Sequence, residues 1–331
     1  MIKRILFYNS GGGIGDSIQI LPLINTLKDE LKSTNFYYLC AHENHFNFSL
    51  KDFNSNIDNI DLDIKYFGFR WWHILIIRNQ IKKKKIEKFD LIIDLQSKIR
   101  NTLILKIIPH KFFISSCFNF FLSKPKINIK KNIKINKTIL SAVNKILNTK
   151  FILKDYDLNK INNKYVEESK RLLPKNNYIG LSITQGNVYR KKEWPLSKII
   201  KLSEEVVKNN KTPVFFIEKK YQELKNKIIN SIPSALFPEH ETQLASPALV
   251  TCLGKRLDFA ISIDNGIMHM LSLAKIPMVV LFGPTSSKKF APNYNDIILL
   301  DSKKLKNTPD INSINVEDVL RELKQHSGFL Y

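Results

Sequence analysis

The chain has 331 residues, 44% of them hydrophobic and 11% aromatic, which is the composition of a globular protein long enough for two domains. The formal net charge of +22 suits an anionic ligand, but Lys is enriched along the whole chain, and the zinc, basic-zipper and ribonucleoprotein motifs of nucleic-acid-binding proteins are absent. No apolar run approaches the roughly 18 residues that cross a bilayer, and the three separated cysteines form no CxxC pair, so we expect a cytoplasmic protein without a disulfide framework, a zinc site or a nucleic-acid partner.

Short apolar runs that end in turn residues alternate with helical patterns, which predicts βαβ units and parallel sheets. The pattern occurs twice and predicts buried strands at Ile5–Tyr8, Phe36–Cys40, Leu91–Leu95 and Phe112–Ser115, and again at Ile179–Ile183, Val214–Ile217, Phe259–Ile263 and Met278–Phe282. The stretch from Lys124 to Lys164 is rich in Lys and Asn with weak periodicity, and we expect it to be peripheral. We therefore predict two α/β domains, residues 1–165 and 166–331, with a closing helix over Val316–Gln325.

A glycine-rich turn follows the first predicted strand, with the sequence Asn9-Ser10-Gly11-Gly12-Gly13-Ile14-Gly15-Asp16. A strand, a glycine turn and a helix are typical of dinucleotide-binding folds, but Asp16 stands where the last glycine of that motif belongs, and its charge would repel a pyrophosphate. Two interpretations of Asp16 stay open. It is either the N-cap of a capping box with Gln19, or a general base that points into a cleft, and the two roles are compatible.

Five phenylalanines lie between Phe112 and Leu122, with Lys111, Lys124 and Lys126 at the flanks. Such a segment either rests on an anionic membrane or forms a buried strand followed by a helix. The four lysines Lys82 to Lys85 likewise suit either lipid phosphates or a solvated helix face. A peripheral contact with a membrane is therefore one of two open interpretations.

A second polar segment follows the predicted strand Ile179–Ile183 and runs from Thr184 to Pro195. It contains the consecutive cations Arg190-Lys191-Lys192, which suit a diphosphate when they lie above a parallel strand. A bare run of charge is more often a solvated surface. The Trp194-Pro195 pair that follows fixes the start of the next helix, which favours a defined loop.

Two further strands are expected to deliver polar turns to one edge of the second sheet. Phe259–Ile263 ends in Asp264-Asn265-Gly266-Ile267-Met268-His269, and Met278–Phe282 ends in Gly283-Pro284-Thr285. Ligands of open α/β sheets bind at this edge, and backbone N–H groups from Gly266 onward could receive phosphate oxygens. His269 could be a partnered helix histidine, but its position in the first turn favours contact with a ligand.

These motifs together resemble glycosyltransferase family 9, the heptosyltransferase family of lipopolysaccharide core assembly. The resemblance covers nearly the whole chain and rests on Gly13-Ile14-Gly15-Asp16 with Leu21-Pro22, Phe89-Asp90-Leu91-Ile92-Ile93-Asp94-Leu95-Gln96 with Arg100, Lys192-Glu193-Trp194-Pro195, Asp264-Asn265-Gly266-Ile267-Met268-His269, and Phe282-Gly283-Pro284-Thr285. It implies a GT-B fold, in which two Rossmann-like domains with parallel sheets face each other across a cleft. It also implies inversion at the anomeric carbon.

The resemblance further implies which residues act. Asp16 matches the position of the catalytic base and Lys192 that of the phosphate-binding lysine. The donor site, in the C-terminal domain, then consists of Thr184, Lys192, Asp264, Asn265, Gly266, His269 and Thr285, and the acceptor site, in the N-terminal domain, of Gly13, Gly15, Gln96 and Arg100. Two positions depart from the family pattern: Asn265 stands where Ser or Thr is common, and Glu218 where Gly is often found.

We therefore expect a monomeric enzyme that moves heptose from ADP-heptose to a lipid-linked lipopolysaccharide inner-core saccharide by single displacement, with no metal or cofactor. One alternative keeps the fold but makes the protein a nucleotide-sugar epimerase, which would need no acceptor. The other is a basic binding protein without catalysis, whose binding would survive loss of Asp16.

Overall fold

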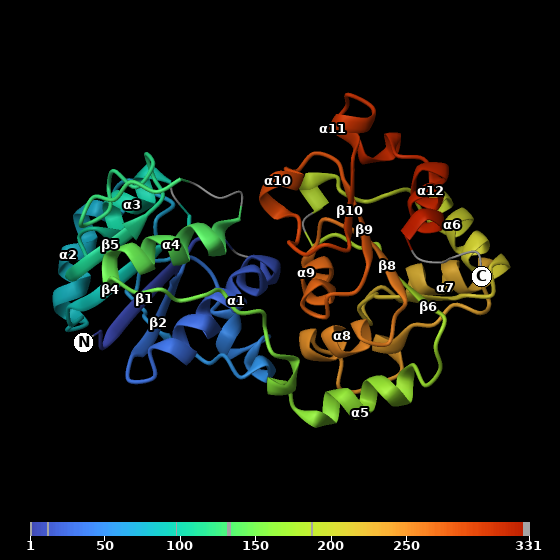
Figure 1. Ribbon diagram of the computed structural model, residues 1–331, viewed down its shortest axis with the longest axis horizontal. Helices are drawn as coiled ribbons and strands as arrows, with labels where there is room; N and C mark the ends of the chain where they lie inside the picture. Colours follow the sequence, from blue (N-terminus) through green and yellow to red (C-terminus); the bar gives the residue numbers. More distant parts are fainter. Residues whose placement is uncertain (1, 12, 97, 131–133, 187, 327–331) are drawn as a thin grey trace. The chain divides into compact units, whose positions relative to one another are not determined.

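The computed structural model describes residues 2–11, 13–96, 98–130, 134–186 and 188–326. The chain forms two compact units, Met1–Tyr156 and Asp157–Tyr331 (Figure 1). The division falls earlier in the chain than the predicted position near residue 165, because helix α5 (Asn163–Leu172) packs on helix α8 (Pro247–Gly254) of the second unit. Just after α5, the backbone carbonyl of Leu173 accepts a hydrogen bond of 3.0 Å from Arg256 Nε.

The first unit contains a parallel sheet with the strand order β3-β2-β1-β4-β5. Its strands are β1 (Arg4–Asn9), β2 (Asn35–Cys40), β3 (Asp58–Asn59), β4 (Phe89–Asp94) and β5 (His110–Ser115). The four predicted strands are confirmed. The two-residue strand β3 was not predicted, because it carries no apolar run. The helices of this unit are α1 (Ile14–Glu30), α2 (His73–Lys83), α3 (Ile99–Leu105) and α4 (Ile135–Leu147).

Helix α4 lies within the stretch that the sequence predicts to be peripheral, and that prediction is wrong for these residues. Ile139, Leu140 and Val143 of α4 are buried, and the helix packs against α1. The side chain of Asn136 also donates to the backbone carbonyl of Gln19 in α1 at 2.7 Å. The abundant Lys and Asn residues around α4 conceal its apolar face in the sequence.

The phenylalanine-rich segment combines features of both interpretations. Its first part is the buried strand β5, but the residues that follow form turns over 117–122 and no helix. Phe113 and Phe120 are buried, whereas Phe118 and Phe121 are exposed. The buried strand is therefore confirmed, the helix is wrong, and two aromatic rings of the segment remain open to solvent.

The second unit contains another parallel sheet, with the strand order β10-β9-β8-β6-β7. Its strands are β6 (Tyr178–Ser182), β7 (Thr212–Phe215), β8 (Phe259–Ile263), β9 (Met278–Phe282) and β10 (Ile297–Asp301), and Leu236 adds a single parallel bridge to Val214 beside β7. Besides α5 and α8, its helices are α6 (Leu196–Lys208), α7 (Gln222–Ser231), α9 (Gly266–Leu273), α10 (Ser287–Phe290), α11 (Ser302–Leu305) and α12 (Val316–His326). The four strands predicted in this half are present.

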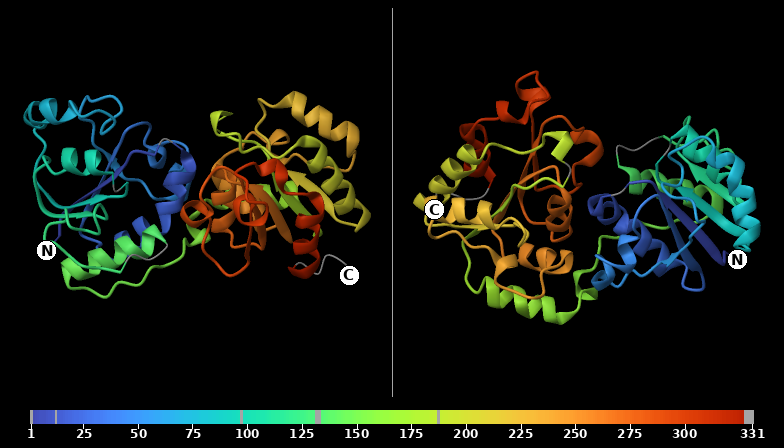
Figure 2. Two further views of the ribbon diagram at one scale, coloured as in Figure 1. Left: turned by 90° about the horizontal axis from the view of Figure 1, so that it is seen from above. Right: turned by 180° about the vertical axis from the view of Figure 1, so that it is seen from behind.

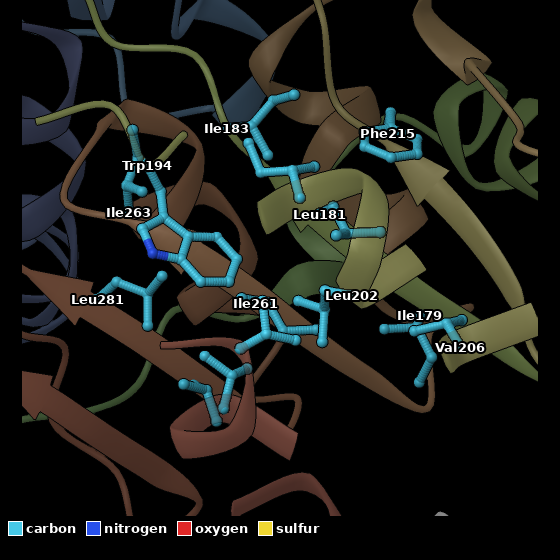
Figure 3. Packing of buried hydrophobic residues seen from close by; sticks show 14 of the residues in the cluster. Ile179, Leu181, Ile183, Trp194, Leu202, Val206, Phe215, Ile261, Ile263 and Leu281 are labelled. Carbon is cyan, nitrogen blue, oxygen red and sulfur yellow. The ribbon is translucent and has the colours of Figure 1, made fainter. Parts of the chain in front are cut away.

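The two views in Figure 2 show helices on both sides of the strands in each unit. In the second unit, α12 packs on α6 and fills the position of the expected closing helix. Trp194 lies in the core of this unit beside Ile263 and Leu281 (Figure 3). Its indole Nε1 donates to the backbone carbonyl of Ile314 at 3.0 Å, which fixes the end of the loop that follows β6.

Each strand order reverses direction at one point in its sheet. In the first unit this switch lies between β1 and β4, and in the second between β6 and β8. Connections leave the two strands on opposite sides at a switch point, which opens a crevice at their carboxyl ends. The glycine turn follows β1, and the Lys192 and Asp264 segments follow β6 and β8, so the topology brings the predicted motifs to the two crevices.

Candidate functional site

Lys192 and Asp264 form a buried ion pair at the switch point of the second sheet. The Nζ of Lys192 donates to the backbone carbonyl of Asp264 and lies 3.1 Å from the carboxylate oxygen Oδ2 of the same residue. Both residues are less than 10% exposed. Burial removes the screening by water, so this pair strongly determines the potential at the carboxyl end of β8.

Asn265 holds the turn after β8 in place and begins helix α9. Its Oδ1 accepts from the backbone N–H of Met268 at 2.9 Å, which makes Asn265 the N-cap of the helix. Its Nδ2 donates to Ser182 Oγ at 2.7 Å and to the backbone carbonyl of Thr184 at 2.8 Å. One side chain therefore joins the two strands at the switch point, and it leaves Gly266 as the first residue of α9.

His269 lies in the first turn of α9 and is buried. Burial lowers the pKa of its imidazole well below the usual value, and the positive charge of Lys192 lowers it further, although Asp264 opposes both. The ring is therefore neutral at physiological pH. A neutral imidazole donates and accepts hydrogen bonds without adding charge to the site.

A cavity of about 740 Å³ lies beside the loop that follows β6. It is lined by polar and charged residues of this loop and by four residues from the segments after β9 and β10, two of them prolines: Gln185, Tyr189, Arg190, Lys191, Glu193, Pro284, Pro309, Asp310 and Asn312. Gln185 also accepts from the N–H of Lys192 at 2.8 Å, so the cavity wall and the buried ion pair share one side chain. The cavity is within the range of about 300–1,000 Å³ that is usual for small-molecule sites.

Thr285 follows β9 in the same unit. Its Oγ1 is buried and makes no hydrogen bond with any residue that the structure describes. Gly283, two residues earlier, packs so closely on Ile311 that an added Cβ would lie 2.7 Å from the Cβ of Ile311. This close approach fixes the turn that carries Thr285.

In the first unit, Asp16 lies in the first turn of α1, where its N–H donates to the carbonyl of Gly13 at 3.1 Å. Gly13 is the N-cap, with φ −96° and ψ 143°, and no side chain caps the helix there. The interpretation of Asp16 as the N-cap of a capping box is therefore wrong. Its half-buried carboxylate folds back over Gly11, where an added Cβ would clash with Oδ2, so a larger residue at this position would displace the side chain of Asp16.

Gln96 is tied to the glycine turn through Asn9. The Oδ1 of Asn9 accepts from the side-chain amide of Gln96 and from the N–H of Gly11, at 2.9 Å for the latter. The N–H of Gln96 donates to Asp94 Oδ1 at 2.9 Å, and the other oxygen of this buried carboxylate accepts from Thr102 and Ser115. The carboxyl ends of β1 and β4 are thus joined by one hydrogen-bond network.

Arg100 has a different surrounding from Gln96. Its Nε donates to the backbone carbonyl of Gly68 at 2.6 Å, in the loop that precedes α2. Arg100 therefore holds that loop. Gly13 and Gly15 lie at the start of α1, and Gly13 is exposed.

The structure therefore brings Lys192, Asp264, Asn265 and Thr184 together at one switch point, and Asp16 and Gln96 at the other. Sequence reasoning did not assign Gln185, Ser182, Asn9 or Asp94, which position these residues. Their signal is positional, because Ser182, Asn9 and Asp94 are the last residues of strands and Gln185 lies three residues after one. Among the described residues, no group of three or more His, Cys, Asp or Glu side chains could hold a metal ion.

No helix in the part of the chain that the structure describes is long and apolar enough to cross a membrane. The chain matches the family model for glycosyltransferase family 9 (heptosyltransferase) over residues 77–320. No curated protein matches the chain.

Several solved structures are similar over almost the full length. The glycosyl transferase family 9 protein from Veillonella parvula has a TM-score of 0.68 at 18% identity, with 98% of this chain and 96% of that chain covered. The E. coli heptosyltransferase WaaC with ADP has a TM-score of 0.67 at 13% identity, with 99% of each chain covered. The UDP-GlcNAc 2-epimerase from Methanocaldococcus jannaschii is similar at a TM-score of 0.57 and 13% identity, covering 98% of this chain and 92% of that one. At these identities the likeness shows the fold alone, which is GT-B with two Rossmann-like units.

Proposed function

The chain belongs to glycosyltransferase family 9, and from this premise we propose that it transfers heptose from ADP-heptose to a lipopolysaccharide inner-core acceptor with inversion at the anomeric carbon. The observation that carries the proposal is the buried Lys192–Asp264 pair at the switch point beside the start of α9. A buried cation and the N-terminus of a helix are what a departing diphosphate requires.

In the proposed reaction, the acceptor hydroxyl oxygen forms a bond to the anomeric carbon as the bond from that carbon to the diphosphate oxygen breaks. The bonding electrons leave with ADP, and the hydroxyl proton moves to the carboxylate of Asp16. Lys192 and the N–H groups at the start of α9 stabilise the growing charge on the diphosphate. Attack opposite the leaving group inverts the anomeric configuration, and no step is assigned to a metal.

ADP is the proposed nucleotide because the similar E. coli heptosyltransferase WaaC has been solved with ADP and, in a second structure, with ADP-2-deoxy-2-fluoro heptose. The donor sites named above all lie in the second unit, and Asp16, Gly13, Gly15 and Gln96 all lie in the first. We assign the nucleotide sugar to the second unit and the acceptor to the first.

The first test is thermal stabilisation of the protein by ADP, UDP, GDP, CMP and NAD. A ligand that binds only the folded state at 100 times its Kd stabilises that state by about 2.7 kcal/mol. We expect ADP to give the largest shift. Stabilisation by NAD alone, or by none of the five, would contradict the donor site.

The second test is the reaction itself, with ADP-heptose and a purified inner-core acceptor, followed by proton NMR of the product. We expect an anomeric configuration opposite to that of the donor. If the sugar is instead isomerised in the absence of acceptor, the protein is an epimerase. Retention of configuration would contradict the single displacement, although the protein would still be a transferase.

A further inference from the structure

The first unit presents an unusual group of exposed apolar side chains before and at the start of α2. We define the aromatic surface as Tyr66, Phe69, Trp71, Trp72 and Leu75, and each of these side chains is at least 36% exposed. Leu75 is 76% exposed, and the two tryptophans are 53% and 54% exposed. Adjacent tryptophans normally bury most of their rings, so a cluster of this kind marks a contact surface.

The loop behind this surface is firmly held. The N–H of Gly68 donates to His73 Nδ1 at 3.0 Å, and its carbonyl accepts from Arg100. Gly68 has a φ of +85°, and an added Cβ would clash with the hydroxyl of Tyr8. That hydroxyl donates to the carbonyl of Phe67 at 2.8 Å. Because four contacts fix the inner side of the loop, the outward direction of the aromatic rings is a property of the fold.

Helix α3 continues the apolar exposure from the aromatic surface to a second aromatic turn. It packs against α2, and its Ile99 and Leu103 are exposed. Lys106, just after α3, donates to the carbonyl of Leu122 at 3.0 Å, in the turn that exposes Phe118 and Phe121. The sequence analysis placed possible membrane contacts at this turn and at Lys82 to Lys85, whereas the larger group of exposed apolar side chains lies at residues 66–75.

The surroundings of the aromatic surface are strongly positive. Residues 64–86 contain seven Lys and Arg residues and no Asp or Glu, and residues 95–154 contain no Asp or Glu. The first unit as a whole has 26 Lys and Arg against 12 Asp and Glu, and the second has 26 against 18. The excess of positive charge is therefore concentrated in the unit that carries the exposed aromatic rings.

We propose that the aromatic surface docks the first unit on an anionic phospholipid bilayer. Trp71, Trp72 and Leu75 enter the boundary between headgroups and acyl chains, and Arg70, Arg78, Lys82, Lys83 and Lys85 contact the phosphates, whereas Lys84 is paired with Asp63 at 2.9 Å. Tryptophan prefers this boundary because its ring is apolar and its N–H is polar, and basic residues around it suit anionic lipid. This inference rests on the proposed function, because docking would bring a lipid-linked acceptor to the unit that carries Asp16.

The test uses the intact protein with vesicles of phosphatidylcholine alone or mixed with phosphatidylglycerol. The chain has three tryptophans, and Trp194 is 4% exposed in the core of the second unit, so a change in emission reports Trp71 and Trp72. We expect a blue shift with the anionic vesicles, quenching by acyl chains brominated near the headgroup, and loss of binding in high salt. No binding to anionic vesicles, or binding without quenching, would overturn the proposal.

Co-sedimentation with the same vesicles tests the residues. We expect Trp71→Ala/Trp72→Ala/Leu75→Ala to weaken binding at least about tenfold, because three exposed side chains lose their apolar burial. The control Phe48→Ala/Ile152→Ala removes two other exposed apolar side chains of the first unit and should bind normally. Equal binding by the triple variant and wild type would overturn the proposal.

A charge pair completes the test. Lys82→Gln/Lys83→Gln should weaken binding to the anionic vesicles more than Lys32→Gln/Lys51→Gln, which removes the same charge elsewhere in the first unit. Binding to a single-stranded oligonucleotide but not to vesicles would overturn the proposal in favour of a nucleic acid. Stabilisation by ADP, measured on each variant, reports the second unit separately and shows whether the proposed function itself has failed.

Discussion

The carboxyl edges of the two sheets each contain one switch point, but they have opposite character. In the second unit, Lys192, Asp264, Asn265 and His269 are each less than 10% exposed, and side chains from neighbouring segments hold them. In the first unit, Gly13 is exposed and Asp16 is half-buried, and exposed aromatic rings lie nearby on the same unit. A site for a diphosphate gains from charges that are already desolvated, whereas a site for a large saccharide has to stay open.

The largest expected effect is on kcat and concerns Asp16, at the open carboxyl edge of the first sheet. Asp16→Asn keeps the size of the side chain but removes the proposed base, and we expect kcat to fall by about 10²–10⁴-fold. The KM for the donor and the stabilisation by ADP should stay unchanged, because both depend on the second unit. A variant with normal kcat would exclude Asp16 as the base. The open edge of the first sheet would then have no assigned catalytic residue.

The next effect concerns the buried edge. Lys192→Ala leaves the carboxylate of Asp264 buried without its cation, and we expect a loss of about 3–5 kcal/mol in the free energy of unfolding. The double variant Lys192→Ala/Asp264→Asn removes that charge and should recover most of the stability but not the stabilisation by ADP. Recovery of both would mean that Lys192 acts only on the fold. Urea unfolding with and without ADP measures the two outcomes.

The third prediction concerns Glu239, a buried carboxyl of the second unit whose charge would have no cation beside it. It lies in the short helix Pro238–His240 and is 7% exposed. Burial, with a smaller contribution from the charge of Glu218, raises the pKa of its carboxyl from 4.5 to about 7. Between pH 4.5 and 7, this carboxyl is still protonated in the folded state but already ionised in the unfolded state. The free energy of unfolding therefore falls as the pH rises through this range.

We expect Glu239→Gln to stabilise the protein at pH 7.5 by up to about 3 kcal/mol, and to change little at pH 4. Urea unfolding at several pH values between 4 and 8 measures the difference. Glu241→Gln is the control, because it makes the same substitution at an exposed carboxyl two residues away. Equal pH profiles for Glu239→Gln and wild type would refute the buried protonated carboxyl.

The smallest expected effect separates two roles of Asn265. Asn265→Ala removes the cap of α9 and should cost about 1–2 kcal/mol in the free energy of unfolding. Asn265→Ser keeps a capping oxygen but loses the hydrogen bonds to Ser182 and Thr184, so a smaller loss is expected. If the two variants are equally unstable, the links between the strands contribute more than the cap. Thermal unfolding ranks the two variants.

The sequence was sufficient to predict most strands, because a strand that is buried on both faces reads as an apolar run. It also placed Asp16, Lys192 and Asp264 in the segments that follow strands. The strand β10 over Ile297–Asp301 was not predicted, although its first four residues are apolar. The Lys-rich and Asn-rich background similarly concealed α4.

Other features depend on contacts that no local pattern contains. Lys192 and Asp264 are 72 residues apart in the chain, so their pairing follows from strand order. The N-cap of α1 is Gly13 and not Asp16. The helix starts where the backbone leaves the extended region, and this point does not depend on which side chain could serve as a cap. Composition also does not distinguish the buried Phe120 from the exposed Phe121 beside it.

Trp194 links the interior of the second unit to the loop that carries Lys192. It lies two residues after Lys192 in the chain, and its ring packs beside Ile263 and Leu281. A smaller residue at either of these core positions would let the ring shift and carry the loop with it. Small displacements of a binding group can lower rates by about 10²-fold. In a selection for growth, substitutions at Ile263 or Leu281 would thus reduce growth in the same way as substitutions of ligand-contacting residues. Measuring the abundance of the protein for each variant would be needed to separate the two groups.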